Sequence, residues 1–146
     1  MSHALLIPVE AGNPARTQDA VQRAVALLAQ EPADVHVLSV QPLVSSHVTA
    51  FFGHGELHKL QHEAGSEEMA DAVSQLQAAG VTAMSHVRVG RRAETIAATA
   101  RELHCDTILM GQDDHPGVVD RLFGSVAGQV RHLLDATPGA CQVIGT

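Results

Sequence analysis

Residues 111–125, with the sequence GQDDHPGVVDRLFGS, combine the residue types that bind phosphate groups. They follow a short apolar run, 107–110, and precede a helical pattern that begins near Val126. Loops between a strand and a helix usually take about 2 to 6 residues, so this connection is longer than packing requires, and surplus length there usually serves a ligand. Gly124 and Ser125 offer backbone N–H groups and a hydroxyl beside the positive end of the helix dipole. The stretch therefore predicts an anion site.

The Gly124–Ser125 pair also fits an ordinary helix start with a serine cap, which is a common arrangement. A hydrolytic triad of Ser125 with His115 or His132 is disfavoured, because the nucleophile pattern G-x-S-x-G is absent. The sequence also lacks the glycine and lysine pattern of a Walker A loop. The length and position of the loop favour nucleotide binding over the plain cap.

Three histidines, His54, His58 and His62, recur every four residues, which would align them on one face of a helix. Histidines at this spacing can share a metal ion, although neither a cysteine nor another fixed ligand accompanies them. The polar neighbours Lys59 and Glu63 favour a solvated helix face instead. We predict no physiological metal site here.

Composition limits the classes of protein that this chain can belong to. The net charge of −7 and the absence of Trp and Tyr disfavour nucleic-acid binding, which needs basic groups and aromatic platforms. We expect a cytoplasmic protein, because no apolar run approaches the roughly 20 residues of a membrane span and residues 1–6 do not resemble a secretory signal. Cys105 and Cys141 fit no zinc spacing and are interpreted as small buried hydrophobic residues.

Hydrophobic periodicity predicts alternating strands and helices. The expected strands are residues 4–9, 35–40, 106–110 and 140–144, with a further strand inside 81–89. The expected helices are residues 15–31, 57–79, 93–103 and about 124–135, with a possible restart of the second helix at Gly65 and Ser66. Residues 43–55 show no clear period and are predicted to form an irregular loop, in which 48–52 should still be buried.

This alternation predicts one domain over residues 1–146, an α/β fold with a five-stranded parallel doubly wound sheet and helices on both faces. Right-handed crossovers reduce the choice to a few strand orders, of which we predict the flavodoxin-like order 3-2-1-4-5. In that order the first and fourth strands are neighbours. The loops that start at Glu10 and Gly111 would then face each other across the crevice where such folds bind ligands.

The strand order, the IPVEAG end of the first strand and the spacing of Gly111, Asp114, Gly124 and Ser125 resemble the universal stress protein family over nearly the whole chain. Members of its nucleotide-binding branch carry Gly-x2-Gly-x9-Gly-(Ser/Thr) after the fourth strand. The resemblance implies ATP as the ligand, and residues near the base, sugar or phosphates at matching positions. These are Pro8, Glu10, Val40, Met110, Gly111, Asp114, Gly117, Gly124, Ser125 and Val126.

Two of these positions depart from the family pattern, since Asp114 replaces the second motif glycine and Glu10 replaces an aspartate. A carboxylate about 4 Å from a phosphate would cost on the order of 4 kcal/mol at an effective dielectric constant of 20. Asp113 and Asp114 could instead hold Mg²⁺ against the phosphates, because Mg²⁺ favours carboxylates together with phosphate oxygens. The sequence leaves both alternatives open.

Three arginines, Arg88, Arg91 and Arg92, flank the end of the third strand near the expected ligand. They suit a solvated turn, although one of them could meet a terminal phosphate. The last strand, 140–144, is short and uncharged at the sheet margin, and relatives in the family commonly dimerise through it, so we predict a homodimer.

The function that follows is nucleotide-dependent regulation in a stress response, with ATP occupancy as the signal. No residue is placed by a motif as a general base, so at most a weak ATPase activity is expected. The alternative is a dimeric interaction protein of the same fold that Asp114 and Glu10 have closed to nucleotides.

Overall fold

The computed structural model describes residues 3–111, 125–135 and 141–145. In chain order these residues form β1 (His3–Pro8), α1 (Pro14–Gln30), β2 (Ala33–Gln41), α2 (Ser46–Ala78), β3 (Ala83–Val89), α3 (Arg92–Glu102), β4 (Thr107–Leu109), α5 (Val126–Asp135) and β5 (Gln142–Ile144). The predicted strands and helices are present, with ends that differ by a few residues, except around the start of α2.

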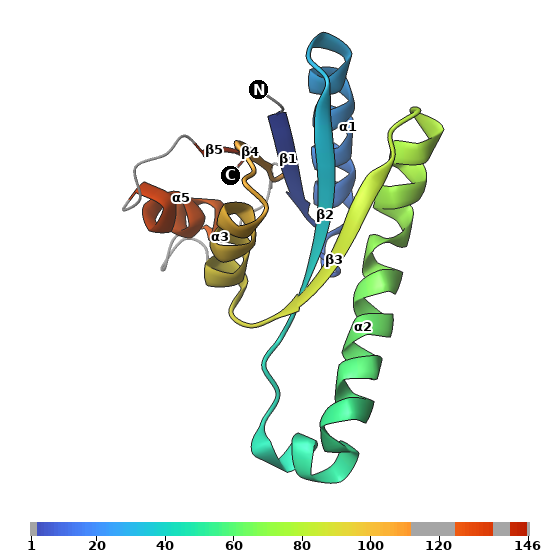
Figure 1. Ribbon diagram of the computed structural model, residues 1–146, viewed down its shortest axis with the longest axis vertical. Helices are drawn as coiled ribbons and strands as arrows, with labels where there is room; N and C mark the ends of the chain where they lie inside the picture. Colours follow the sequence, from blue (N-terminus) through green and yellow to red (C-terminus); the bar gives the residue numbers. More distant parts are fainter. Residues whose placement is uncertain (1–2, 112–124, 136–140, 146) are drawn as a thin grey trace.

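The strands form one parallel sheet in the order β3-β2-β1-β4-β5 (Figure 1). Leu5 pairs with Thr107 and Leu6 with Ile108, so β1 and β4 are direct neighbours. This confirms the predicted flavodoxin-like order. Because the strands are parallel, the C-terminal ends of β1, β2 and β4 meet at one edge of the sheet.

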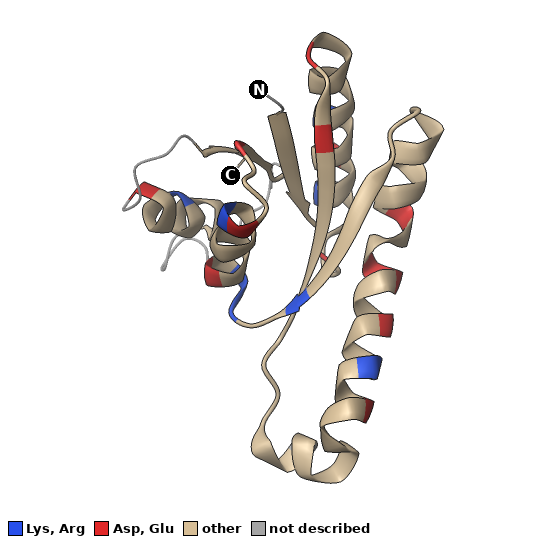
Figure 2. Ribbon diagram, in the orientation of Figure 1, with Lys and Arg blue, Asp and Glu red and all other residues tan. Residues whose placement is uncertain are grey.

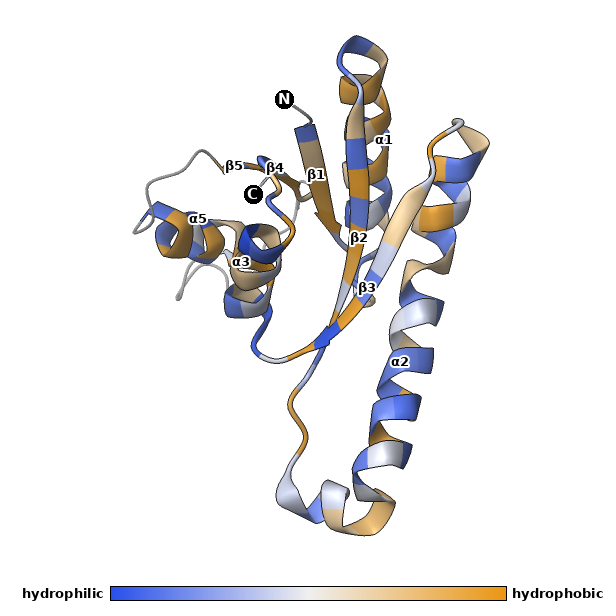
Figure 3. Ribbon diagram, in the orientation of Figure 1, coloured by the Kyte–Doolittle hydropathy of each residue, from blue (hydrophilic) through white to orange (hydrophobic). Residues whose placement is uncertain are grey.

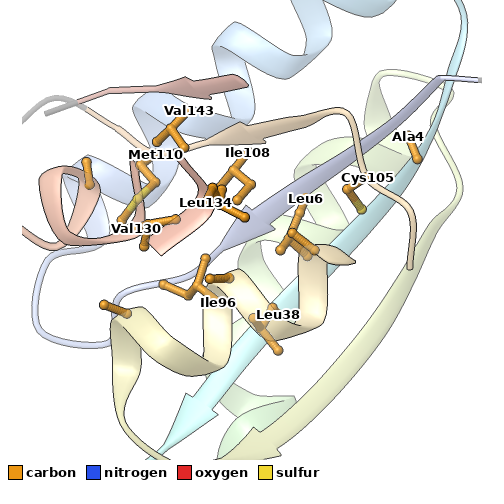
Figure 4. Close-up of a cluster of buried hydrophobic side chains, with 14 residues drawn as sticks. Ala4, Leu6, Leu38, Ile96, Cys105, Ile108, Met110, Val130, Leu134 and Val143 are labelled. Atoms are coloured by element: carbon orange, nitrogen blue, oxygen red, sulfur yellow. The ribbon is translucent and has the colours of Figure 1, made fainter. Parts of the chain in front are cut away.

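Hydrophobic side chains cover both faces of this sheet. One cluster joins Leu6 of β1 to Ile96 of α3 and Val130 of α5 (Figure 4). The other joins Ile7 of β1 to Met69 of α2 and to residues of α1. Successive residues of β1 thus face opposite layers, as expected for a parallel strand buried on both sides. We call these the α3/α5 layer and the α1/α2 layer.

The predicted irregular loop at residues 43–55 is wrong from Ser46 onward, because α2 already begins there. Gly53 interrupts the helical backbone with φ 70° and ψ 161°, a conformation that favours glycine. The expected burial of 48–52 is wrong for Phe51 and Phe52, whose exposed fractions are 87% and 43%.

Helix α2 continues through Gly65, so the helix does not restart at that residue. A Cβ on Gly65 would lie 2.7 Å from Val87 Cγ2, so the glycine allows α2 to pack closely against β3. From there Met69, Ala72 and Leu76 are buried in the α1/α2 layer. The preceding half of α2 projects beyond the sheet (Figure 1) and is mostly hydrophilic (Figure 3). Within the described ranges, no helix is long and apolar enough to span a bilayer.

Two histidines connect the neighbouring strands β2 and β3. His36 Nδ1 lies 2.9 Å from His86 Nε2, so one ring donates its N–H to an unprotonated nitrogen of the other. Burial lowers the pKa of His36, against a smaller opposing effect of Asp34. Burial also lowers the pKa of His86, helped by His36 and Arg88 and opposed by Glu102. Both rings are therefore favoured in their neutral form.

The lowered pKa values of this pair predict a loss of stability in acid. Each group contributes stability above the ordinary histidine pKa of about 6.5, and that contribution falls as the pH drops below this value. Wild type should therefore lose more unfolding free energy between about pH 7.5 and pH 5 than the His86→Gln variant. Urea titrations at both pH values measure this difference.

His3 has the opposite effect, since a hydrogen bond to Asp106 raises its pKa and its contribution is lost as the pH rises above about 6.5. It is present in both proteins, so it cancels in the comparison. Equal pH dependence of wild type and variant would contradict the prediction.

Candidate functional site

The C-terminal ends of three strands and the start of α5 place four of the predicted residues on the α3/α5 side of the sheet. Met110 belongs to the hydrophobic cluster of that layer (Figure 4), and Val40 and Val126 are partly buried residues that pack against this cluster. Pro8 pairs with Leu38, another member of the cluster, and paired residues of parallel strands face the same layer. Pro8, Val40 and Met110 thus lie at or just after the C-terminal ends of β1, β2 and β4, and Val126 begins α5 on the same side of the sheet.

Ser125 immediately precedes α5 and caps it. Its Oγ accepts a hydrogen bond of 3.0 Å from the backbone N–H of Gly128. The plain serine cap considered from the sequence is therefore present. A helix start offers four N–H groups without partners in the helix, and this cap uses one of them, so the arrangement is compatible with an anion nearby.

Three predicted residues, Asp114, Gly117 and Gly124, lie outside the described residues, as does Asp113. Their assignment to phosphate or Mg²⁺ remains a prediction.

Gly111 follows β4 where α1 crosses the end of the sheet. A Cβ at this position would overlap the backbone carbonyl oxygen of Arg16 in the first turn of α1. The glycine is therefore required for the close approach of helix and strand. This packing role was missed in the sequence, where Gly111 was assigned only to the ligand.

Arg16 ties together the segments that meet at Gly111. Its side chain is 6% exposed, its Nε donates to the carbonyl oxygen of Gly111 at 2.7 Å, and its Nη1 donates to Glu10 Oε1 at 3.2 Å. Sequence reasoning did not single out this residue. A signal was present, because Asn13 and Pro14 mark a helix start and so place Arg16 in the first turn beside the end of β1.

Glu10 lies on the other side of the sheet edge from the four apolar site residues. It lines a hollow of about 440 Å³ between α1 and α2, together with the acidic residues Glu67, Glu68 and Asp71. Its carboxylate is 18% exposed and pairs with two arginines, since Oε1 lies 3.2 Å from Arg16 Nη1 and 3.5 Å from Arg92 Nη2.

Of the three arginines near the end of β3, only Arg92 reaches the end of β1 within the described residues. Its Nη2 donates to the carbonyl oxygen of Val9 at 3.2 Å, besides contacting Glu10. Arg91 pairs with Glu94, and Arg88 pairs with Glu102 across an exposed surface. Figure 2 shows basic residues where β3 leads into α3, whereas most charged residues along α2 are acidic. Burial lowers the pKa of Arg92, and the nearby Glu10 opposes that effect.

A groove of about 560 Å³ lies between the first turns of α3 and α5. Arg91, Arg92 and Glu94 line it from α3, and Val126, Gly128 and His132 line it from α5. The groove therefore joins a predicted phosphate-site residue, Val126, to two guanidinium groups and one carboxylate. Because Glu94 pairs with Arg91, the guanidinium that is left to face an anion is that of Arg92.

His54, His58 and His62 all lie on α2. Among the described residues no three His, Cys, Asp or Glu side chains are placed to hold a metal ion. His54 and His62 are separated by eight residues, or about 12 Å along a helix, which is too far to share one ion. His58 and His62 are closer, with ring centroids 6.4 Å apart.

Both cysteines are free thiols. Cys105 is buried in the α3/α5 layer, which confirms its interpretation as a small buried hydrophobic residue, and burial raises its pKa to about 12. Cys141 is only partly buried, and burial likewise raises its pKa.

A parallel sheet in the order β3-β2-β1-β4-β5 with helices on both faces defines a flavodoxin-like α/β protein. Residues 1–136 match the model of the universal stress protein family, and the chain belongs to this family. No curated protein matches the chain.

Solved universal stress proteins share the fold at low sequence identity. One in complex with cAMP is 18% identical with a TM-score of 0.68, over 99% of this chain and 96% of that chain. The protein from Archaeoglobus fulgidus in complex with dAMP is 20% identical with a TM-score of 0.64, over 98% and 96% of the two chains. UspA from Lactobacillus plantarum is 18% identical with a TM-score of 0.68, over 98% and 96%.

The packing of Gly111 predicts a large effect of the smallest substitution there. Gly111→Ala should lower the unfolding free energy by about 1 to 3 kcal/mol or more, because the new methyl group overlaps the backbone of Arg16. Gly12→Ala is the matched control, since no atom lies within 4 Å of its added Cβ, and it should stay within about 0.5 kcal/mol of wild type. Chemical denaturation measures both, and equal stabilities would contradict the assigned contact.

Proposed function

We propose that this universal stress protein binds an adenine nucleotide at the C-terminal ends of β1 and β4 and acts through its occupancy. The observation that carries the proposal is the position of the α5 N-terminus. The helix begins at Val126, and this residue lines the groove of about 560 Å³. We place the base and the sugar near Pro8, Val40 and Met110, which lie at or just after the C-terminal ends of β1, β2 and β4. In open α/β sheets, ligands bind at this kind of edge.

Nucleotide complexes of related folds support the ligand class. Universal stress proteins of the same fold were crystallised with cAMP and with dAMP. Both ligands join an adenine base to a phosphate group. For this chain we propose ATP or a shorter adenine nucleotide, with Mg²⁺ held against the phosphates by Asp113 and Asp114 where the nucleotide carries several phosphates.

The charge of Glu10 is compensated in the structure. Its Oε1 lies within 3.5 Å of both Arg16 and Arg92, so two positive charges stand beside one negative charge. This pairing removes the repulsion of a phosphate that an isolated carboxylate would cause. Glu10 therefore does not exclude a nucleotide by its charge.

The proposed role is regulatory rather than catalytic. No described side chain is placed by a motif as a general base for water, so hydrolysis should be slow compared with binding and release. The bound or empty state of the crevice would then be the signal that a partner reads.

A second candidate function is an interaction protein of the same fold without a nucleotide. The ion pairs of Glu10 with Arg16 and Arg92 favour it, because they place the protein's own side chains at the end of β1. Calorimetric titration with AMP and with ATP, each with and without Mg²⁺, distinguishes the two functions. Binding in any condition supports the nucleotide function, and an absence of heat in all four supports the interaction function.

A charge placed at the start of α5 should weaken nucleotide binding. Val126→Asp puts a carboxylate in the groove, and like-charge repulsion should reduce AMP affinity by roughly tenfold or more, equivalent to about 1.4 kcal/mol. Val126→Asn, with the same shape and no charge, is the matched control and should bind AMP several-fold more tightly than the aspartate variant. Equal affinities of the two variants, measured by calorimetry, would place the phosphate elsewhere.

We also propose a homodimer through the free edge of β5. The N–H of Gln142 and the carbonyl oxygen of Ile144 bond to residues beside β4, so the backbone groups of Val143 point to the opposite edge. Arg131 Nη2 donates to the carbonyl oxygens of Val143 at 3.1 Å and Gly145 at 2.6 Å. Pairing with a second copy would therefore use the N–H of Val143 and displace Arg131.

The dimer is tested by removing that single donor. Val143→Pro should convert the dimer to a monomer in light scattering after gel filtration, because proline lacks the N–H that faces the partner. Val143→Ala keeps the N–H, trims the same side chain and should stay dimeric. A monomeric wild type, or a proline variant that remains a dimer, would contradict pairing through this edge.

A further inference from the structure

Arg92 is a partly buried cation with donors left over. A guanidinium group carries five N–H donors on three nitrogens. Nη2 accounts for both of its contacts, with Val9 and Glu10. Within residues 3–111, 125–135 and 141–145, Nε and Nη1 have no hydrogen-bond partner. The side chain is 27% exposed, and no buried side-chain nitrogen of the described residues lacks a partner, so these donors are open to water or to a ligand.

The carboxylate that faces Arg92 is already shared. Glu10 lies 3.2 Å from Arg16, the closer of the two arginines, and 3.5 Å from Arg92. Charge-assisted hydrogen bonds between guanidinium and carboxylate groups are usually about 2.7 to 2.9 Å long, so the contact with Arg92 is a weak one. The next carboxylate, Glu68, accepts hydrogen bonds from Ser39 and Gln41. Arg92 thus lacks a strong anionic partner among the described residues.

Arg92 also forms one wall of the groove between α3 and α5. Val126 and Gly128 in the first turn of α5 form the opposite wall. The helix has ten residues, so its N-terminus contributes a partial positive charge to the same groove. Arg91 lines the groove too, but it is exposed and paired with Glu94.

A phosphate group matches this set of donors. Its oxygens can accept from the planar fork of a guanidinium and from backbone N–H groups at a helix start at the same time. We propose that Arg92 binds the phosphate of the nucleotide and makes the site select nucleotides over nucleosides. This inference rests on the proposed function, and it adds the residue that sets the preference.

The test compares AMP, adenosine and inorganic phosphate by calorimetry. Wild type should bind AMP roughly tenfold to a hundredfold more tightly than adenosine, as expected for hydrogen bonds to a charged group. Arg92→Gln should remove most of this ratio and leave adenosine affinity within about twofold of wild type. Arg88→Gln is the matched control, because Arg88 pairs with Glu102 away from the groove, and it should keep the wild-type ratio.

A second variant keeps the test valid if Arg92→Gln proves unstable. Glu10→Gln removes the anion that competes for Arg92, so the ratio of AMP to adenosine affinity should rise several-fold above wild type. A ratio that stays unchanged in both variants would overturn the role of Arg92.

The outcomes also separate this inference from the proposed function. Wild type that binds adenosine and AMP equally would overturn the inference and leave adenine binding intact. Wild type that binds neither would overturn both. Wild type could instead bind inorganic phosphate but neither AMP nor adenosine, and lose this binding in Arg92→Gln. Arg92 would then bind a free anion, and its role in nucleotide selection would be overturned.

Discussion

The contact between the end of β4 and the first turn of α1 is the constraint on which the rest of the site depends. Gly111 leaves no room for a side chain against the backbone of Arg16, and the Arg16 guanidinium returns to the carbonyl oxygen of Gly111. The same guanidinium holds Glu10 after β1. One buried arginine therefore fixes α1, β1 and β4 relative to one another where the crevice begins. If the contact between Gly111 and Arg16 were loose, the ends of β1 and β4 would shift relative to each other.

The strand order was predictable because it follows from local patterns and handedness. Runs such as residues 4–9 are apolar on both faces, which indicates parallel strands covered by two layers, and few topologies then remain. The start of α2 was not predictable in the same way. Hydrophobic periodicity marks a helix only where one face is buried. Residues 46–56 project beyond the sheet, and none of those whose burial is described is buried, so hydrophobic periodicity does not indicate a helix there.

The candidate site likewise contains residues that could be predicted from the sequence and contacts that could not. Pro8, Val40 and Met110 were predictable as a group because they end neighbouring strands, and the sheet order alone brings strand ends together. The contacts of Arg16 and Arg92 depend instead on how far these long side chains reach across the end of the sheet. Arg16 and Gly111 are 95 residues apart, and Arg92 and Val9 are 83 apart. No sequence periodicity encodes such contacts, although the cap at Asn13 indicated where Arg16 would lie.

Arg16 and Arg92 have different roles in this arrangement. Arg16 stabilises the fold, and Arg92 is the residue that we propose responds to the ligand. Arg16 is buried and bonded through Nε to the backbone at Gly111, so removing it would take this donor from the carbonyl of Gly111 and leave Glu10 with only the longer contact to Arg92. Arg92 is more exposed and shares Glu10 at a longer distance. A phosphate oxygen that competes with Glu10 would therefore draw away Arg92 and leave the Arg16 contact intact. Ligand exchange at Arg92 would change the charge of the groove without loosening the joint between α1 and β4, as an occupancy signal requires.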